Sequence, residues 1–530
     1  MAVKKQSFMN GVLIIMMSQV LIKIFGFVYR VVLTNFPQFG DEGNSYYGSG
    51  YQVYSLLLAI ATTGIPNTIS KLVSEKIAVG DKKGAHKIFK TALVVFSLIG
   101  VIFALGLFFG AGFIANNILK NPGVKYTLMS LAPAIIFVSM SAVLRGYFVG
   151  MQNMTEYSKA QIIEQVVNSV FSILFVVLLI GSTPQIMAAG STLATTVAAS
   201  SAFLYLLIYY RKNRKDIKVE VNEARDFGQD SFKKIAKKLI TYAIPISFGS
   251  VVVALSGVID LVSVMDGLQK FGYDIQTANE KFGIILGKVD ILYSVPLSLN
   301  VAFSVALVPF ISSAIAKGKK KEAVDKINYS LKVSSIIAFP CAVGMFVLAT
   351  PIFLLIFPNA SAGAPLLQIQ CWGIIFSVIS QTLYGSLQGL GKVYVPGACL
   401  ALGAVVKYIL NVTLVPKYGE IIPAISTVVY NIVAFTTSFI ILFKTLKQKP
   451  NLKGIFGKVL IASIGMGIIT IFAYNIMSVI GMKNSISTLV SMLVAVISYA
   501  FLVLKMKILN ENEIKQLPMG NKIYKLVYKK

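Results

Sequence analysis

The sequence is poor in the residues that build catalytic and metal sites. Its 530 residues include one His and three Cys, and only 21 are Asp or Glu. Cys341, Cys371 and Cys399 lie in apolar stretches without CxxC spacing, so we expect neither disulfides nor metal ligands. His86 stands alone in a basic loop, and no phosphate-binding GxxxxGK[ST] loop occurs. We therefore expect no metal, no cofactor and no ATP-driven step.

Charge is also scarce. Only 13% of the residues are charged and 56% are apolar, whereas soluble domains carry about 25% charged residues. Apolar runs of 18 or more residues recur from end to end, which predicts an all-α polytopic membrane protein with 14 transmembrane helices. The expected spans lie near 8–34, 46–70, 88–112, 124–149, 159–180, 184–210, 239–265, 280–310, 328–356, 364–390, 394–416, 420–443, 456–480 and 484–505. The first run is too long for a cleavable signal.

The distribution of positive charge predicts the orientation of the chain. A net charge of +28 would suit nucleic acid, but most of the 49 Lys and Arg residues fall in the two tails and in alternate loops. This bias places both termini in the cytoplasm. Anionic membrane lipids are sufficient partners for these lysines, so we expect no nucleic acid.

An internal repeat divides the chain. The segment 80–93 aligns with 318–331, the segment 144–150 aligns with 383–389 through L-x-G-x-x-x-G, and Ser191-Thr192 aligns with Ser426-Thr427. Both copies start on the same side, which predicts two pseudo-twofold six-helix lobes plus two C-terminal helices. The expected parts are an N-lobe (1–212), a cytoplasmic basic linker with an amphipathic helix (213–238), a C-lobe (239–446), spans 13 and 14 (447–505) and a cytoplasmic tail (506–530).

The first span carries two cations, Lys23 and Arg30. They are seven residues apart, which puts them on one helix face, roughly 10 Å apart along the axis. A charge near the middle of a membrane costs at least ~2.5–3.5 kcal/mol, so both should face a cavity or a partner. The alternative is that they reach the interface or pair with a carboxylate.

Further charges lie within the spans. Together with Lys23 and Arg30, the middle and outer half hold Asp260, Lys288, Asp290 and Lys407, which makes four cations and two carboxylates. If the two carboxylates pair with two cations, positive charge is left over, and a cavity between the lobes would then suit an anionic substrate such as a phosphate. The alternative is a set of structural ion pairs.

Two more pairs of positions are candidates. Arg145 and Glu164 flank the turn 151–158, where they would either form an inner gate pair or be satisfied interfacial charges. Lys407 and Asn411 share a helix face and mark a possible coupling-ion position, although a resident Lys disfavours a metal cation.

Four stretches carry a resemblance to a known family. They are KIFGFVYR (23–30), IPNTISKLVSE (65–75), LRGYFVGMQNMTEYSKAQIIEQ (144–165) and AFSVALVPFISSAIAKG (302–318). They resemble the MurJ-type lipid II flippases and, more closely, the stage V sporulation protein B-like polysaccharide flippases of Gram-positive bacteria. Both groups belong to the multidrug/oligosaccharidyl-lipid/polysaccharide exporter superfamily. The resemblance covers essentially the whole chain.

The resemblance implies a location, a mechanism and a site. A bacterial plasma-membrane flippase of this kind carries an undecaprenyl-pyrophosphate-linked glycan outward by alternating access through a central cationic cavity. Lys23 falls at the first basic position of the family's span 1, and Arg30 is displaced by one residue from the second, with Tyr29 in the expected slot. In span 8, Asp290 fits the family pattern, Ile291 takes the basic slot, and Lys288 would replace it from the preceding turn.

The function expected from the sequence is therefore a flippase, most specifically one for lipid II, acting as a monomer in peptidoglycan biosynthesis. The alternatives are a flippase for another polyprenyl-linked polysaccharide and a multidrug cation antiporter of the same superfamily. A membrane glycosyltransferase or polymerase is a different class, and the short outer loops disfavour it.

Overall fold

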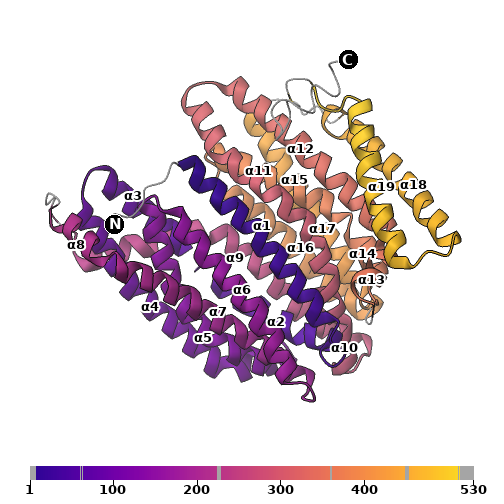
Figure 1. Ribbon diagram of the computed structural model, residues 1–530, viewed down its shortest axis with the longest axis horizontal. Helices are drawn as coiled ribbons and strands as arrows, with labels where there is room; N and C mark the ends of the chain where they lie inside the picture. The colour runs from indigo at the N-terminus through magenta and orange to yellow at the C-terminus, as the bar shows by residue number, and fades with distance from the viewer. Residues whose placement is uncertain are drawn as a thin grey trace. The chain divides into compact units, whose positions relative to one another are not determined.

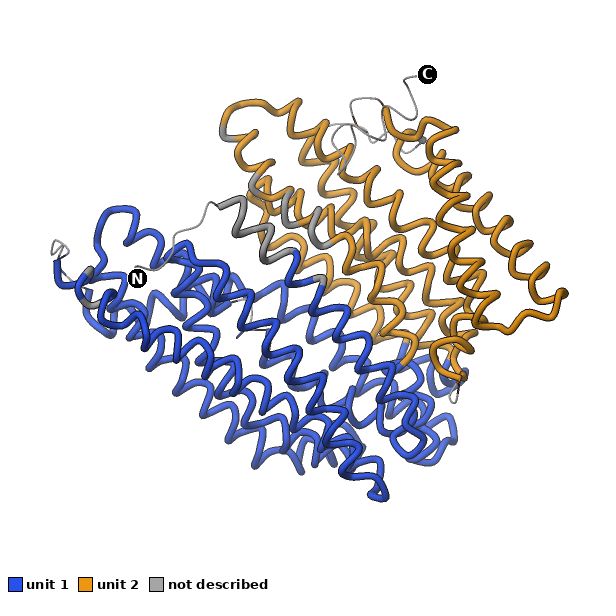
Figure 2. Tube along the Cα trace, in the orientation of Figure 1, with its two compact units in different colours: residues 1–287, 411–420 blue, residues 288–410, 421–530 orange. Residues whose placement is uncertain are grey.

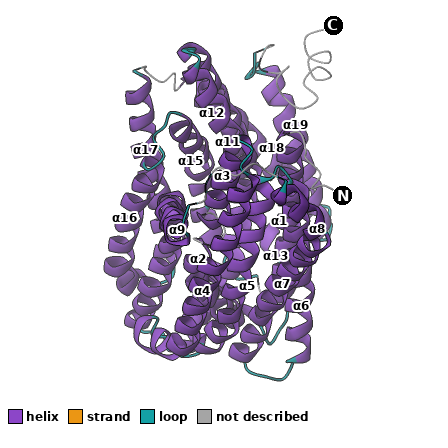
Figure 3. Ribbon diagram, turned by 90° about the vertical axis from the view of Figure 1, so that its left-hand side faces the viewer, coloured by secondary structure: helices purple, strands orange, loops and turns teal. Residues whose placement is uncertain are grey.

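The protein is all-helical over the part of the chain that can be described. The computed structural model describes residues 8–59, 61, 64–223, 228, 230–358, 361–447, 453–510 and 513. No strand occurs among these residues (Figures 1 and 3), which confirms the predicted fold class. Most of the predicted tail 506–530 and residues 224–227 and 229 of the predicted linker lie outside the described residues.

The helices follow one another with short connections. In chain order they are α1 (Phe8–Thr34), α2 (Gly40–Ala59), α3 (Ile65–Ala78), α4 (Lys82–Phe113), η2 (Ile114–Ile118), α5 (Val124–Gly150), α6 (Met154–Leu178), α7 (Pro184–Lys212), α8 (Arg214–Asn222), α9 (Phe232–Phe271), α10 (Ile275–Ile284), η3 (Ile285–Val289), α11 (Asp290–Ala316), α12 (Lys320–Val347), α13 (Ala349–Ile356), α14 (Ala364–Gln370), α15 (Gly373–Gly389), α16 (Val395–Tyr418), α17 (Ile421–Leu446), η4 (Lys453–Gly457), α18 (Lys458–Val479) and α19 (Asn484–Lys505).

Most of the predicted spans are present. Among the described residues, 12 helices are long and apolar enough to cross a membrane, and the pair α14–α15, bent by 42°, would make 13. The predicted span 46–70 covers the end of α2 and the start of α3, and residues 60, 62 and 63 between these helices lie outside the described residues. The helix count is thus consistent with 14 spans without reaching that number.

The internal repeat is visible in the backbone. Gly80 and Gly318 both have positive φ, +81° and +72°, between two successive helices. After Gly80, the amide of Asp81 donates to the carbonyl of Lys76 at 2.9 Å, and after Gly318 the amide of Lys319 donates to Ala314 at 2.9 Å. The turn from α3 to α4 therefore has the same geometry as the turn from α11 to α12.

The repeated glycines allow close helix packing in both copies. A Cβ on Gly146 of α5 would lie 2.8 Å from the carbonyl oxygen of Pro66 on α3. A Cβ on Gly385 of α15 would lie 2.5 Å from the carbonyl oxygen of Ser304 on α11. Such close backbone approach is typical of small residues at membrane helix interfaces.

The helices form two compact units (Figure 2). The first comprises Met1–Gly287 and Asn411–Glu420, and the second comprises Lys288–Leu410 and Ile421–Lys530. In the first unit α5 packs against both α4 and α7. In the second, α11, α12, α15 and α17 bury a shared apolar core that includes Ile311, Ile327, Val378 and Leu442. The terminal pair α18 and α19 lies side by side (Figure 1) and packs on α12 through Val343, Met466 and Ala495.

The structure differs from the predicted linker. Residues 213–238 do not end in a separate amphipathic helix, because residues 232–238 form the first turns of α9, which continues for 40 residues. Ser231 caps this helix, and its side chain accepts a hydrogen bond from the amide of Lys234 at 3.4 Å. The contacts of α9 and α10 with α2 also place both helices in the first unit, whereas the predicted C-lobe began at residue 239.

Candidate functional site

Arg30 of α1 lies against an aromatic ring of α2. Its guanidinium carbon is 4.2 Å from the centroid of the Tyr47 ring, a cation–π distance. The Tyr47 hydroxyl lies 2.9 Å from the hydroxyl of Tyr29, which adjoins Arg30 on α1. The Nη1 atom of Arg30 is buried and has no hydrogen-bond partner within the described chain. Because an unmet buried donor is costly, this N–H group is suited to donate a hydrogen bond to an anionic oxygen.

Tyr47 begins a row of aromatic rings along α2. The rings of Tyr47 and Tyr51 are stacked with centroids 5.6 Å apart and an interplanar angle of 6°. Tyr54 meets Tyr51 edge-to-face at 5.4 Å. Tyr47 and Tyr54 are buried, and Tyr51 is partly buried. We did not predict this row from the sequence, although the spacing 47, 51, 54 is the signature of one helix face.

Lys23 lies two helical turns before Arg30 on α1. Its side chain is exposed, and within the described residues it forms no hydrogen bond or ion pair. The neighbouring surface of α1 is polar where it meets α6. Gln19 donates to Gln161 at 2.9 Å, and a Cβ on Gly26 would lie 3.7 Å from the amide nitrogen of Gln165. The two span 1 cations thus have different surroundings, one exposed and one against an aromatic ring.

Arg145 of α5 and Glu164 of α6 form an ion pair. The Arg145 side chain is 8% exposed and that of Glu164 is 28% exposed. The Arg145 Nε is buried without a hydrogen-bond partner in the described part of the chain. The contact that the sequence suggested is therefore present, while its role as a gate stays a prediction.

Asp260 of α9 lies against Asn411 of α16. The Asn411 amide donates to Asp260 at 3.0 Å and to the Ser263 hydroxyl at 3.1 Å. Lys407, one turn earlier on α16, is buried, with its ammonium 5.6 Å from the centroid of the Tyr430 ring. The hydrogen bond from Asn411 to Asp260 therefore joins α16 to α9.

Lys288 and Asp290 lie where the π-helical turn η3 passes into α11. Lys288 is fully buried, and its ammonium donates to the carbonyl of Ala362 at 3.4 Å. Asp290 accepts a hydrogen bond from the Gln370 amide at 2.6 Å. π-Turns often mark functional positions in helices, so this location is compatible with a binding role.

The predicted site residues are divided between the two units. The first unit holds Lys23, Arg30, Arg145, Glu164, Asp260 and Asn411, and the second holds Lys288, Asp290 and Lys407. Among the described residues, no group of three or more His, Cys, Asp or Glu is placed to hold a metal ion. The described contacts of these residues are ion pairs, hydrogen bonds and cation–π contacts.

Two protein-family models and several curated relatives match the chain. A family model described as polysaccharide biosynthesis protein matches residues 8–315, and one described as MatE matches residues 285–413. The chain is 26% identical to the lipid II flippase MurJ of Bacillus subtilis over 423 residues, covering 77% of each protein. It is 25% identical to the stage V sporulation protein B of the same organism over 403 residues, covering 76% of this chain and 77% of that protein.

Solved structures share the fold. A lipid II flippase MurJ in an inward closed conformation matches with a TM-score of 0.68 at 16% identity, covering 93% of this chain and 98% of the other. An inward-facing multidrug resistance transporter of the MATE family matches with a TM-score of 0.66 at 14% identity, covering 84% and 98%. At these identities the likeness shows the fold alone.

Proposed function

We propose, from the premise that this chain belongs to the polysaccharide biosynthesis protein family, that it flips a lipid-linked oligosaccharide from the inner to the outer leaflet of the plasma membrane. The family and the fold are those of multi-pass membrane transporters and flippases. The proposed cargo is an undecaprenyl-pyrophosphate-linked peptidoglycan precursor of the lipid II type. A different polyprenyl-linked polysaccharide is the alternative cargo.

The observation that carries this proposal is the setting of Arg30. Its guanidinium lies over the Tyr47 ring while its Nη1 has no partner among the described residues. Stacking occupies the flat face of a guanidinium and leaves its N–H edges for hydrogen bonds. Those edges match two phosphate oxygens in a bidentate geometry, which favours a pyrophosphate over a neutral or cationic substrate.

Two lysines would add to this charge. Lys23 is exposed on the same helix as Arg30 and acts as a mobile point charge. Lys288 is buried at the η3–α11 junction, where its charge favours a nearby anion. A headgroup of sugars, peptide and pyrophosphate cannot cross hydrocarbon unaided, so these cations would stabilise it during alternating access while its tail stays in the lipid.

The MatE match over residues 285–413 raises the second candidate, a multidrug cation antiporter. That function needs carboxylates facing the substrate. Within the matched stretch, Lys288 and Lys407 are buried, and the acidic Asp290 accepts a hydrogen bond from Gln370. Buried cations disfavour a cationic substrate, so we place the antiporter second.

The experiment is a flipping assay with purified protein in proteoliposomes. Fluorescent lipid II is placed in the leaflet that corresponds to the cytoplasm, and its arrival in the other leaflet is measured beside a cationic dye. We expect the wild type to move lipid II and not the dye, and Arg30→Ala to lose about 90% of the rate, since a charge-assisted hydrogen bond contributes about 1.5–3 kcal/mol. Equal rates for wild type and Arg30→Ala would remove Arg30 from the site, and movement of the dye alone would favour the antiporter.

A further inference from the structure

The internal repeat places a cavity at the same location in each unit. Both lie at the turn between two repeat-related helices, α3–α4 in the first unit and α11–α12 in the second. In the register that aligns Gly80 with Gly318, four pairs of lining residues correspond. They are Leu72 and Phe310, Gly84 and Glu322, Lys87 and Asp325, and Ile88 and Lys326. The two cavities are therefore counterparts, so their differences are informative.

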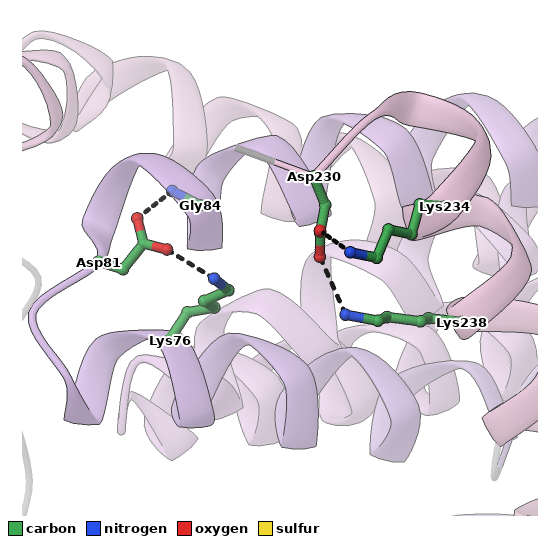
Figure 4. Close-up of polar contacts among 6 residues, drawn as sticks. All are labelled: Lys76, Asp81, Gly84, Asp230, Lys234 and Lys238. Carbon is green, nitrogen blue, oxygen red and sulfur yellow. Dashed lines mark hydrogen bonds and ion pairs between the residues drawn. The ribbon is translucent and has the colours of Figure 1, made fainter. Parts of the chain in front are cut away.

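The cavity of the first unit is small and adjoins the chain's own carboxylates. It measures about 120 Å³. Beside it, Asp81 accepts hydrogen bonds from the amide of Gly84 and the ammonium of Lys76, both at 2.7 Å. Asp230 pairs with Lys234 at 2.7 Å and with Lys238 at 2.9 Å (Figure 4). The lysines Lys76 and Lys238 that line this cavity thus already have anionic partners.

The cavity of the second unit is larger and richer in lysine. It measures about 1160 Å³, and its walls include Lys319, Lys321, Lys326 and Lys332. Lys319 occupies the place of Asp81, so the anion at the turn is replaced by a cation. Lys326 occupies the place of Ile88, where its ammonium lies 5.4 Å from the Phe310 centroid and 4.9 Å from the Tyr329 centroid.

The acidic residues of this cavity compensate only part of the charge. Lys319 pairs with Glu322 at 3.2 Å, but both side chains are largely exposed, and such pairs contribute little. Asp325 also lines the cavity, and its negative charge repels an anion. Lys321 forms no hydrogen bond or ion pair within the described residues. Four lysines therefore face three carboxylates, of which the third, Glu513, comes from beyond the last membrane helix.

Glu513 resembles a ligand held in the cavity. Both oxygens of its carboxylate accept hydrogen bonds from the Lys332 ammonium, at 2.9 and 3.0 Å. The carboxylate also accepts a hydrogen bond from the backbone amide of Asn510 at 2.7 Å. The Tyr329 hydroxyl donates to its backbone carbonyl at 3.2 Å. Lys332 therefore already holds one anionic group in this cavity.

We propose that this cavity binds the phosphate of an anionic membrane lipid, with Lys321 and Lys326 as its main contacts and Glu513 as an internal competitor. The cavity lies where α12 and η4 begin, at the ends of membrane-crossing helices. Phe310 and Ile455 add apolar walls beside the lysines. A volume near 1160 Å³ exceeds the need of a free phosphate and accommodates a lipid headgroup with its glycerol. Lipid binding at this location is independent of the transported cargo.

The test measures lipid binding by the full-length purified protein in a neutral detergent. Short-chain phosphatidylglycerol is titrated while native mass spectrometry follows bound lipid, with short-chain phosphatidylcholine and inorganic phosphate as comparison probes. We expect phosphatidylglycerol to bind best, and Lys321→Ala/Lys326→Ala to weaken it about thirtyfold, because each of the two lysines near a membrane surface contributes on the order of 1 kcal/mol toward anionic lipid. The matched control is Lys83→Ala, since Lys83 is the repeat counterpart of Lys321 and should leave binding unchanged.

Glu513→Gln provides the opposite test. Removing the competing carboxylate should tighten phosphatidylglycerol binding several-fold, a gain that a misfolded variant cannot produce. Equal binding of both lipids, inorganic phosphate binding as tightly as phosphatidylglycerol, or weaker binding by Glu513→Gln would each overturn the proposal. So would an equal loss in Lys83→Ala and in the double variant.

Discussion

At the scale of single residues, the chain separates its two span 1 cations by environment. Arg30 is fixed against the Tyr47 ring, while Lys23 extends from α1 without a partner in the described structure. The sequence predicted that both positions matter and that they share a helix. It could not predict the aromatic partner, because that contact depends on how α1 packs against α2.

We expect the cation–π contact of the Tyr47 ring with Arg30 to affect the transport rate, and the Tyr47 hydroxyl to have little effect on it. Tyr47→Phe keeps the ring beneath Arg30 and removes only the 2.9 Å contact with Tyr29. Tyr47→Leu removes the cation–π contact, worth ~0.5–2 kcal/mol. We expect near wild-type flipping from Tyr47→Phe and about a fivefold loss from Tyr47→Leu in proteoliposomes. Equal rates for the two variants would show that the ring does not position Arg30.

Asp230 gives a prediction about pH. Hydrogen bonds from Lys234 and Lys238 lower the pKa of its carboxyl to about 2. A lowered folded-state pKa stabilises the start of α9 above the ordinary Asp pKa of about 3.9, and that stabilisation is lost as the pH falls toward 2. We therefore expect pepsin cleavage near residues 228–240 to rise between pH 4 and pH 2.5. Asp230→Asn should already be cleaved at the higher pH, and a variant indistinguishable from wild type at pH 4 would contradict this assignment.

At the scale of helices, the two glycine contacts of the repeat should be equivalent. A Cβ at Gly146 or Gly385 would come within 3.0 Å of a backbone carbonyl on the facing helix, which cannot move aside alone. Gly146→Ala and Gly385→Ala should therefore each destabilise the protein by about 1–3 kcal/mol, the usual range for overpacking. Gly106 of α4 has no neighbour within 4 Å of such a Cβ, so Gly106→Ala is the control and should not lower the melting temperature in detergent. A neutral Gly146→Ala would mean that α5 and α3 are less tightly packed than described.

The helices also show what the sequence could and could not predict. The repeat in 80–93 and 318–331 could be recognised because its glycines and lysines align locally, and the structure shows that Gly80 and Gly318 both have positive φ. Local signals failed at one place. The basic residues 232–238 belong to the long helix α9 and not to a separate surface helix. That outcome depends on tertiary packing, which periodicity does not report.

The same distinction applies to the site. Arg145 and Glu164 flank a short turn, so a contact between them was one expected arrangement, and the structure contains it. The sequence named Asp260 and Asn411 as candidate residues but did not predict their hydrogen bond, which joins positions 151 residues apart. Pairings across such distances follow from the fold, so the sequence could suggest the residues and not their partners.

At the scale of the whole molecule, the proposed function predicts a dependence on membrane potential. An anionic headgroup that moves outward is favoured by an inside-negative potential, by ~2.3 kcal/mol per charge for each 100 mV. In proteoliposomes with a potassium diffusion potential, an inside-negative interior should accelerate outward flipping of lipid II, and reversing the potential should slow it. A rate unaffected by either sign would indicate that net charge does not move with the cargo.

The most direct test of the proposed function is complementation. The chain is expressed in bacteria depleted of their own lipid II flippase, beside Lys23→Ala/Arg30→Ala and the charge-matched surface control Lys82→Ala/Lys83→Ala, all at equal membrane levels. We predict growth with the wild type and with the control, and lysis with the span 1 variant. Growth with the span 1 variant would contradict the assigned site, and lysis with correctly inserted wild type would contradict lipid II as the cargo.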